Sequence, residues 1–306
     1  MAPRALATRL GALAQGFDGD VGIAVTDVRS GWTIGAGATG LFPQQSVSKL
    51  WVALTVFDAI DRGAMRLDQP VIVRREDLVV FHQPLAALIG PDGHATTVSA
   101  LLERALTTSD NLANDKLLTL AGGPSAVRAM LARHGLDGIR FGPGERLLQA
   151  GTAGLAWRQD YAVNGGFLRA RAALPMETRR AALERYLADP VDGASPAGIT
   201  RALSRLAKGD LLSPESTRRM LALMAASRTG PGRLRGGLTP GWALAHKTGT
   251  GQELGAVATG YNDVGLLTGP GGRRYGVAVL IGRTTRPIPV RQRLMIEVMR
   301  AVIAAG

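Results

Sequence analysis

The stretches that decide this fold are three short strings, Ser46-Val47-Ser48-Lys49, Ser109-Asp110-Asn111 and Lys247-Thr248-Gly249. The first opens a strongly apolar run and predicts a buried helix from about Ser46 to Ile60. The second falls on a turn between two predicted helices, and the third ends a predicted strand. Because residues three apart share a helix face, the first string brings a serine and a lysine together. The set indicates an activated serine.

A serine hydroxyl becomes a good nucleophile when a neighbouring group takes its proton. Lys49 can do so, because burial lowers the pKa of a lysine. A helix starting at Ser46 would also direct backbone N–H groups at developing negative charge. The ordinary alternative is a capping Ser46 and a solvated Lys49, but the apolar run that follows favours a buried lysine.

The other two strings also have alternative interpretations. Ser109 and Asp110 could cap the next helix, or Ser109 could relay a proton while Asn111 binds a substrate amide. The string from Lys247 to Gly251 could be a strand that turns over two glycines. It could equally be an edge along which a substrate lies, with Lys247 attracting a carboxylate.

Strand-like runs cluster at both ends of the chain, at 21–25, 32–34, 242–247, 257–267 and 274–281, and the segment between them is mainly helical. This pattern predicts an α/β (α+β) fold: an antiparallel sheet built from both termini, flanked by helices, with an inserted, mostly helical lobe.

The predicted lobe boundaries follow from the same pattern. We expect an α/β lobe from 1–45 and 228–306, and a helical lobe over 46–227. Several glycines between 135 and 193 favour loop, with one predicted helix at 176–187.

Composition narrows the chemistry. The 306 residues include no cysteine, which excludes cysteine nucleophiles, thiolate metal sites and disulfides. There are four histidines, His82, His94, His134 and His246, and they share no metal-type spacing, so we expect no metal site. A serine activated by a lysine also needs no cofactor, and we expect none. The net charge of +12 raises nucleic-acid binding, but aromatic residues are only 5% and the arginines are scattered, so we expect no nucleic-acid partner.

Membrane and targeting signals are weak. No run approaches the ~20 apolar residues of a membrane span. The start, Met1-Ala2-Pro3-Arg4, lacks the apolar region of a secretory signal. This start is consistent both with a cytoplasmic protein and with a chain whose signal has been removed.

With these strings in this order, the chain resembles the serine β-lactamases of class A and the related penicillin-binding proteins, over nearly its whole length. The resemblance implies that Ser46 is the acylated nucleophile and Lys49 its proton-transfer partner. It implies that Ser109 relays a proton to the departing nitrogen and that Asn111 contacts the substrate's side-chain amide. It further implies a carboxylate-binding edge formed by Lys247, Thr248 and Thr250. The oxyanion hole would be formed by the backbone N–H groups of Ser46 and Thr250.

Glu145-Arg146-Leu147-Leu148-Gln149 lies 36 positions after Ser109, where class A members carry an E-x-x-L-N string on a loop. The resemblance implies that Glu145 activates the deacylating water, the step that separates a hydrolase from a transpeptidase. Gln149 replaces the usual asparagine on a longer arm, so the water would be held less well or shifted. The alternative for Glu145 is a solvated loop residue.

Further positions match the family less specifically. Arg233 lies where some carbapenem-hydrolysing members place an arginine beside the lysine of the K-T-G string, and Arg235 competes for that place. Phe81 and His82 lie where the family has an aromatic gatekeeper; a core phenylalanine and an exposed histidine are the alternative.

The chain departs from the family after Gln149. The stretch of about 150–194 is some tens of residues longer than expected, and could form a lid, reshape the pocket or carry an accessory interface. A smaller insertion lies between Gly251 and Asn262.

The resemblance implies a periplasmic or secreted antibiotic-resistance enzyme that hydrolyses β-lactams through an acyl-enzyme on Ser46. Lys49, or Glu145 through a water, would deprotonate the serine. One alternative is a D,D-peptidase or esterase of the penicillin-binding type, which has no use for Glu145. Another is a β-lactam sensor that is acylated once and not turned over. The sequence leaves open the substrate spectrum and the oligomeric state, for which a monomer is the expectation.

Overall fold

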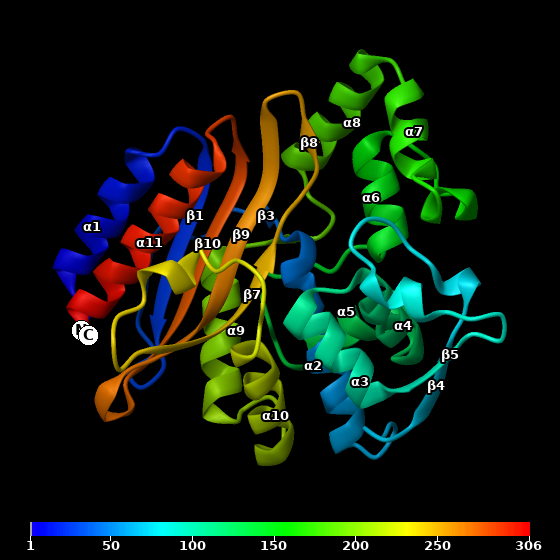
Figure 1. Cartoon of the computed structure of the whole chain (residues 1–306). Helices are drawn as coiled ribbons and strands as arrows, with labels where there is room; N and C mark the ends of the chain where they lie inside the picture. Colours follow the sequence, from blue (N-terminus) through cyan, green and yellow to red (C-terminus); the bar gives the residue numbers. More distant parts are fainter. Residues whose placement is uncertain (1) are drawn as a thin grey trace.

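The computed structural model describes residues 2–306, and in it strands from both ends of the chain form one antiparallel sheet of order β2-β1-β10-β9-β7, with β8 also paired to β9 (Figure 1). The strands are β1 (Asp20–Asp27), β2 (Thr33–Ala36), β3 (Phe42–Pro43), β4 (Pro70–Val73), β5 (His94–Thr97), β6 (Gly193–Ala194), β7 (Ala243–Gly249), β8 (Glu253–Leu254), β9 (Val257–Thr268) and β10 (Arg274–Thr284). Two small pairs, β3 with β6 and β4 with β5, lie outside the main sheet.

Helices cover the sheet and build the rest of the molecule (Figure 1). They are α1 (Arg4–Gln15), α2 (Lys49–Asp61), α3 (Val98–Glu103), α4 (Asn111–Leu120), α5 (Gly123–Arg133), α6 (Glu145–Ala153), α7 (Gly166–Ala173), α8 (Met176–Ala188), α9 (Pro196–Lys208), α10 (Pro214–Ala225) and α11 (Ile288–Ala305). This mixed architecture confirms the predicted fold class.

The central strands are buried on both faces, which explains why β9 and β10 read as nearly continuous apolar runs. One face packs against α1 and α11, in a core that includes Leu10, Val279 and Val298. The other face packs against α9 and the helical part of the molecule. A sheet covered on both sides gives its edge strand β7 a rigid position.

The helical part is organised around α2, whose residues from Lys49 to Ala59 are all buried. A helix that is apolar on every side needs neighbours all round it. Leu50, Leu54 and Phe57 share one core with residues of α3, α4, α5 and α10. The first of the three strings therefore begins the most deeply buried helix of this lobe.

The predicted lobes, 1–45 with 228–306 and 46–227, stay a prediction, and α9 connects them. This helix covers β1 and β10, and the Thr26 hydroxyl donates to Thr200 Oγ1 at 2.8 Å. Ile199 and Leu203 also belong to the core built around α2. The two lobes share this helix.

The prediction of mainly loop with one helix between 135 and 193 was wrong. The segment contains α6 and α7 as well as the expected α8. Three of its glycines stand at helix ends: Gly144 precedes α6, Gly154 ends it with φ 83°, and Gly165 precedes α7 with φ 68°, whereas Gly151 lies within α6. Glycine is favoured at such left-handed end positions, so these residues mark boundaries of helices.

The stretch of about 150–194, predicted to be enlarged, contains α7 and α8, which lie beside α6 at the β8 end of the sheet (Figure 1). The segment after Gly251, predicted to be a smaller insertion, contains β8 and its tight turn into β9. Among residues 2–306, no helix has both the length and the apolarity needed to cross a bilayer.

Candidate active site

Ser46 lies on a 3₁₀ turn, Gln45–Ser48, that leads into α2. The α-helix begins at Lys49, three residues after the predicted start at about Ser46, and Gln45 at the beginning of the turn has a left-handed backbone with φ 53°. A non-glycine residue in this region is strained and needs support from its surroundings. That support includes a buried carboxyl: the Gln45 N–H donates to Asp192 Oδ2 at 2.8 Å.

The sheet edge packs directly on this turn. A Cβ added to Gly249, the last residue of β7, would lie 2.4 Å from the Gln44 carbonyl oxygen. Only glycine fits this close approach. The third string therefore reaches the nucleophile turn because it ends in glycine.

Lys49 contacts the Ser46 hydroxyl as the spacing predicts. Its Nζ donates to Ser46 Oγ at 2.7 Å and to Asn111 Oδ1 at 2.8 Å, and the residue is 1% exposed. Burial lowers the pKa of Lys49, while the carboxylates led by Glu145 act in the opposite direction. A lysine with a lowered pKa is better able to take the serine proton.

Ser109 and Lys247 form a second hydroxyl–amine pair. Ser109 has φ 61° and accepts a hydrogen bond from Lys247 Nζ at 2.8 Å, and the same amine donates to the Thr248 carbonyl at 2.9 Å. Lys247 is fully buried; burial, Lys49 and Arg233 together lower its pKa well below the usual value. The hydroxyl of Thr248 lies 2.7 Å from that of Thr229.

Asp110 accounts for the capping interpretation of the second string. Its carboxylate accepts from the backbone N–H of Ala113 at 3.0 Å and of Leu85 at 2.7 Å. Capping is thus the task of Asp110, and its neighbours Ser109 and Asn111 line the cavity.

Asn111 joins Lys49 to Glu145. Its Nδ2 donates to Glu145 Oε1 at 2.9 Å and to the Val80 carbonyl at 2.9 Å, so both N–H groups are engaged. The predicted contact of Asn111 with a substrate amide can use the second acceptor site of Oδ1, whereas a bond donated by Nδ2 would have to replace one of these two.

Glu145 is the first residue of α6, not a loop residue as predicted. Burial raises its pKa to about 7; Lys49 acts against this shift and Asp115 adds to it. The neighbouring Gln149 side chain also acts to lower the pKa of Glu145. A carboxyl with a pKa near 7 can take and return a proton close to neutral pH.

Gln149 belongs to a buried network of amides, a phenol and a carboxyl. Its Nε2 donates to Gln45 Oε1 at 2.9 Å, and its Oε1 accepts from Gln252 Nε2 at 2.9 Å. Gln45 Nε2 in turn donates to the Tyr186 hydroxyl at 2.7 Å, which donates to Asp192 Oδ1 at 2.8 Å. Burial raises the pKa of Asp192 to about 6.

Of the two candidate arginines, Arg233 lies at the site. Its Nη1 donates to the carbonyls of Gly249 at 2.9 Å and Asn262 at 2.6 Å, and its Nη2 donates to Thr250 Oγ1 at 2.6 Å. The guanidinium also lies 3.8 Å from the ring centre of Tyr261. Arg235 is held instead by the carbonyls of Ser227 and Ala225.

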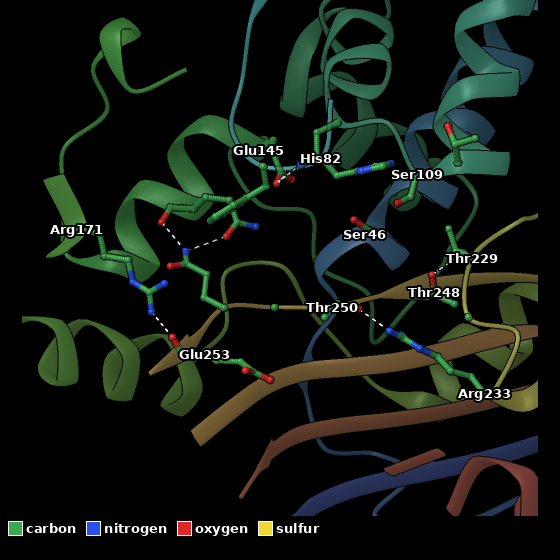
Figure 2. A pocket seen from close by; sticks show the side chains of 17 residues that line it. Ser46, His82, Ser109, Glu145, Arg171, Thr229, Arg233, Thr248, Thr250 and Glu253 are labelled. Atoms are coloured by element: carbon green, nitrogen blue, oxygen red, sulfur yellow. Dashed lines mark hydrogen bonds between the residues drawn. The ribbon is translucent and has the colours of Figure 1, made fainter. Parts of the chain in front are cut away.

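The predicted side chains meet at one cavity of about 450 Å³ (Figure 2). Those that line it are Ser46, Phe81, His82, Ser109, Asn111, Glu145, Gln149, Arg233, Thr248 and Thr250. Lys49 and Lys247 are buried behind this wall and reach it through the two serine hydroxyls.

The aromatic residue at the cavity is exposed, which excludes a core phenylalanine. Phe81 is 43% exposed, has φ 62° and packs edge-to-face on Phe167 of α7 at 5.1 Å. His82 is also exposed, and its carbonyl accepts the Asn111 N–H at 2.9 Å.

Sequence reasoning missed several residues at this site. Arg171, Gln252 and Glu253 line the cavity, and Gln45, Tyr186 and Asp192 support it from behind. One signal for the supporting residues was available in the sequence, because a polar residue, Gln45, directly precedes the nucleophile Ser46. In the part of the chain that the structure describes, no group of three or more histidine and acidic side chains could hold a metal ion.

A serine held by a buried lysine, with a second lysine and a carboxyl at the same cavity, defines a class of serine hydrolases that work without histidine. A family model described as "Beta-lactamase enzyme family" matches residues 5–303, and the chain belongs to this family.

Among curated relatives, β-lactamase VEB-1 of Pseudomonas aeruginosa is 25% identical over 280 residues, covering 92% of this chain and 83% of VEB-1. The extended-spectrum β-lactamase PER-1 of the same organism is 29% identical over 241 residues, covering 78% of this chain and 67% of PER-1. The predicted recognition as a class A serine β-lactamase is confirmed, and the protein is a hydrolase of that class.

Solved structures agree. The class A β-lactamase of the last common ancestor of Gram-negative bacteria has a TM-score of 0.78 and 30% identity, covering 98% of this chain and 99% of that one. The TLA-3 extended-spectrum β-lactamase has a TM-score of 0.81 at 22% identity and covers 99% of each chain, a likeness of fold.

Proposed function

We propose that this β-lactamase opens the β-lactam amide by forming an ester with Ser46, and that a water activated by Glu145 hydrolyses the ester. The observation that carries the proposal is that Ser46 and Glu145 line one cavity and are linked through Lys49 and Asn111. Membership of the family supports β-lactam hydrolysis as the overall reaction.

Acylation starts at Ser46. Lys49, in its neutral form, takes the hydroxyl proton directly, or Glu145 takes it through a water, and the freed oxygen attacks the β-lactam carbonyl carbon. The backbone N–H groups of Ser46 and Thr250 then stabilise the oxyanion; losing one such donor typically costs ~3 kcal/mol. Thr250 lies just beyond the end of β7 and lines the cavity, which suits this task.

Collapse of the tetrahedral intermediate breaks the carbon–nitrogen bond. Ser109 gives its proton to the departing nitrogen and recovers one from Lys247, whose Nζ lies 2.8 Å from Ser109 Oγ. The substrate carboxylate lies at Thr248 and Thr250, in the field of Lys247 and Arg233. The buried amine and the guanidinium make this end of the cavity positive.

Deacylation takes place on the side of the cavity that contains Glu145. Glu145 takes a proton from water, the hydroxide attacks the ester carbonyl, and Ser46 leaves with a proton returned from the group that first took it; exchange with solvent then removes the proton from Glu145 and restores that of Lys247. The pKa of about 7 suits a base that must be ionised near neutral pH. The amide of Gln149 donates to Gln45, on the turn that carries Ser46, and its side chain also influences the pKa of Glu145. Gln149 thereby lies between Glu145 and that turn.

The substitution E145Q tests the proposal against its alternatives. It should leave acylation by penicillin intact and lower turnover by about 10³-fold, so that intact-mass spectrometry detects a trapped adduct. A variant that turns over nitrocefin like the wild type would rule out Glu145 as the deacylating base. A wild type that itself stays acylated would identify a sensor, and release of D-alanine from stem peptides would identify a D,D-peptidase.

We further propose a periplasmic or secreted location and a role in antibiotic resistance, because its substrate class acts on the cell envelope. Fractionation of cells that carry the native gene tests the location. Loss of penicillin tolerance on deletion of that gene tests the role.

A further inference from the structure

The inserted segment contributes a cation to the cavity wall. Of the described residues 150–194, Arg171 of α7 alone lines the cavity. Its Nη2 donates to the backbone carbonyl of Glu253, the first residue of β8. In the view of Figure 2, Arg171 and Arg233 lie at opposite ends of the site, with Ser46 between them.

The charge of Arg171 has no carboxylate partner within residues 2–306, because no carboxylate oxygen lies within ion-pair distance of its guanidinium. Glu253 offers only its backbone, since its carboxylate pairs with Arg291 at 3.2 Å. The neighbouring charge is the cation Arg179, which together with burial lowers the pKa of Arg171. A half-buried cation beside another cation favours an anion on its open side.

The two arginines differ in the donors they have left. Arg233 uses its guanidinium to hold Gly249, Asn262 and Thr250. Arg171 is held through Nη2, and a guanidinium has five N–H donors arranged as a fork that fits a carboxylate. Arg171 is therefore the arginine with donors free to bind a substrate group.

The proposed function also fixes which substrate group reaches Arg171. With the ring carboxylate at Thr248 and Lys247, the acyl side chain extends past Ser46 toward Gln149, Gln252 and Arg171. All of these except the buried Lys247 line the same cavity.

We propose that Arg171 determines specificity by binding an anionic group on the acyl side chain, so that this enzyme favours β-lactams that carry a second carboxylate there. The inference rests on the proposed function, because that function sets the orientation of the substrate. It assigns to the insertion a task in substrate selection.

The test compares two penicillins that differ by one carboxylate, benzylpenicillin and its α-carboxy derivative carbenicillin. The readout is the ratio of their kcat/KM values for the purified full chain. R171Q should lower the ratio of carbenicillin to benzylpenicillin roughly fivefold, as expected of a partly exposed ion pair, mainly through KM. R171K, which keeps the charge, should recover part of it.

R169Q is the matched control. Arg169 lies on the same helix, is exposed and is held by the Asn164 carbonyl outside the cavity. Its removal should leave the ratio unchanged. An equal loss for both penicillins in R171Q would show that Arg171 only holds β8 in place, and would overturn the inference.

Failure of the proposed function gives a different result. If the wild type is acylated but not turned over, the ratio of the two acylation rates, followed by intact mass, tests Arg171 in the same way. If neither penicillin acylates Ser46, both the proposed function and this inference are wrong. If both are hydrolysed and R171Q keeps the wild-type ratio, only the inference is wrong.

Discussion

The two walls of the cavity are built in different ways. The sheet-edge wall holds buried cations in direct contact with hydroxyls, as in the pair of Lys247 and Ser109. The opposite wall, which we call the loop wall, contains Glu145 at the start of α6 and a chain of neutral amides and a phenol that begins at Gln149 and ends on the carboxyl of Asp192. The first wall comes from short strings of adjacent residues, and the second joins four separate segments. Catalytic residues that lie in a short motif can be predicted from the sequence, whereas residues that reach the site only through packing between distant segments cannot.

The largest effect on kcat/KM should come from the sheet-edge wall. K247A removes the amine that contacts Ser109 and the charge near the proposed carboxylate site, so we expect kcat/KM for penicillin to fall by about 10²–10³-fold. Steady-state kinetics check this, with thermal unfolding to exclude a misfolded variant. R235A is the control, because Arg235 contacts only carbonyls away from the cavity and should change kcat/KM less than twofold. Similar losses in both variants would contradict the special role of this wall.

The loop wall should determine the pH dependence. The pKa of Glu145 is about 7, so its carboxylate form, and with it the deacylation rate, should fall about tenfold for each pH unit below that value. Single-turnover decay of the acyl-enzyme between pH 5 and 8 measures this rate. A flat profile would assign deacylation to another group.

The same shift has a consequence for stability. The folded state binds the Glu145 proton more tightly than the unfolded state, so this contribution is fully favourable below pH 4.5 and is lost as pH rises toward 7. Above pH 7 the ionised carboxyl costs at most about 3 kcal/mol. E145Q should therefore raise the melting temperature at pH 8 and have little effect at pH 5. A stabilisation that is equal at both pH values would show a cause other than ionisation.

The smallest effect should come from the far end of the loop wall. Y186F removes the hydroxyl between Gln45 and Asp192 and leaves buried polar groups without a partner, a loss of about 1–3 kcal/mol in unfolding free energy. We also expect kcat to fall more than the acylation rate, because Gln45 contacts Gln149 beside Glu145. Y161F, on a ring that packs against Phe167, is the control and should change neither quantity. Unchanged stability in Y186F would show that the network is dispensable.

The sequence predicted the parts of the fold that are periodic or strongly apolar. The strand predicted at 257–267 is β9, and the strand predicted at 274–281 lies within β10. The spacing of Ser46 and Lys49 also predicted their contact correctly. These features depend on neighbours along the chain.

The remaining features depend on tertiary packing. The left-handed backbone of Gln45 is not expected for a glutamine, and it is supported by the buried carboxyl of Asp192, far away in sequence. Tyr186 and Gln252 have no local pattern that marks them as neighbours of the site. The glycines around α6 were interpreted as loop because sequence alone does not distinguish a helix end from an irregular segment.

The position of α9 has a consequence for how the molecule melts. Because Ile199 and Leu203 share one core with Ala278 and Leu280 of β10 and with the residues around α2, opening of the helical part would expose one whole apolar face of the sheet. Heating should therefore give a single cooperative transition, with equal calorimetric and van't Hoff enthalpies, although two lobes are predicted for the chain.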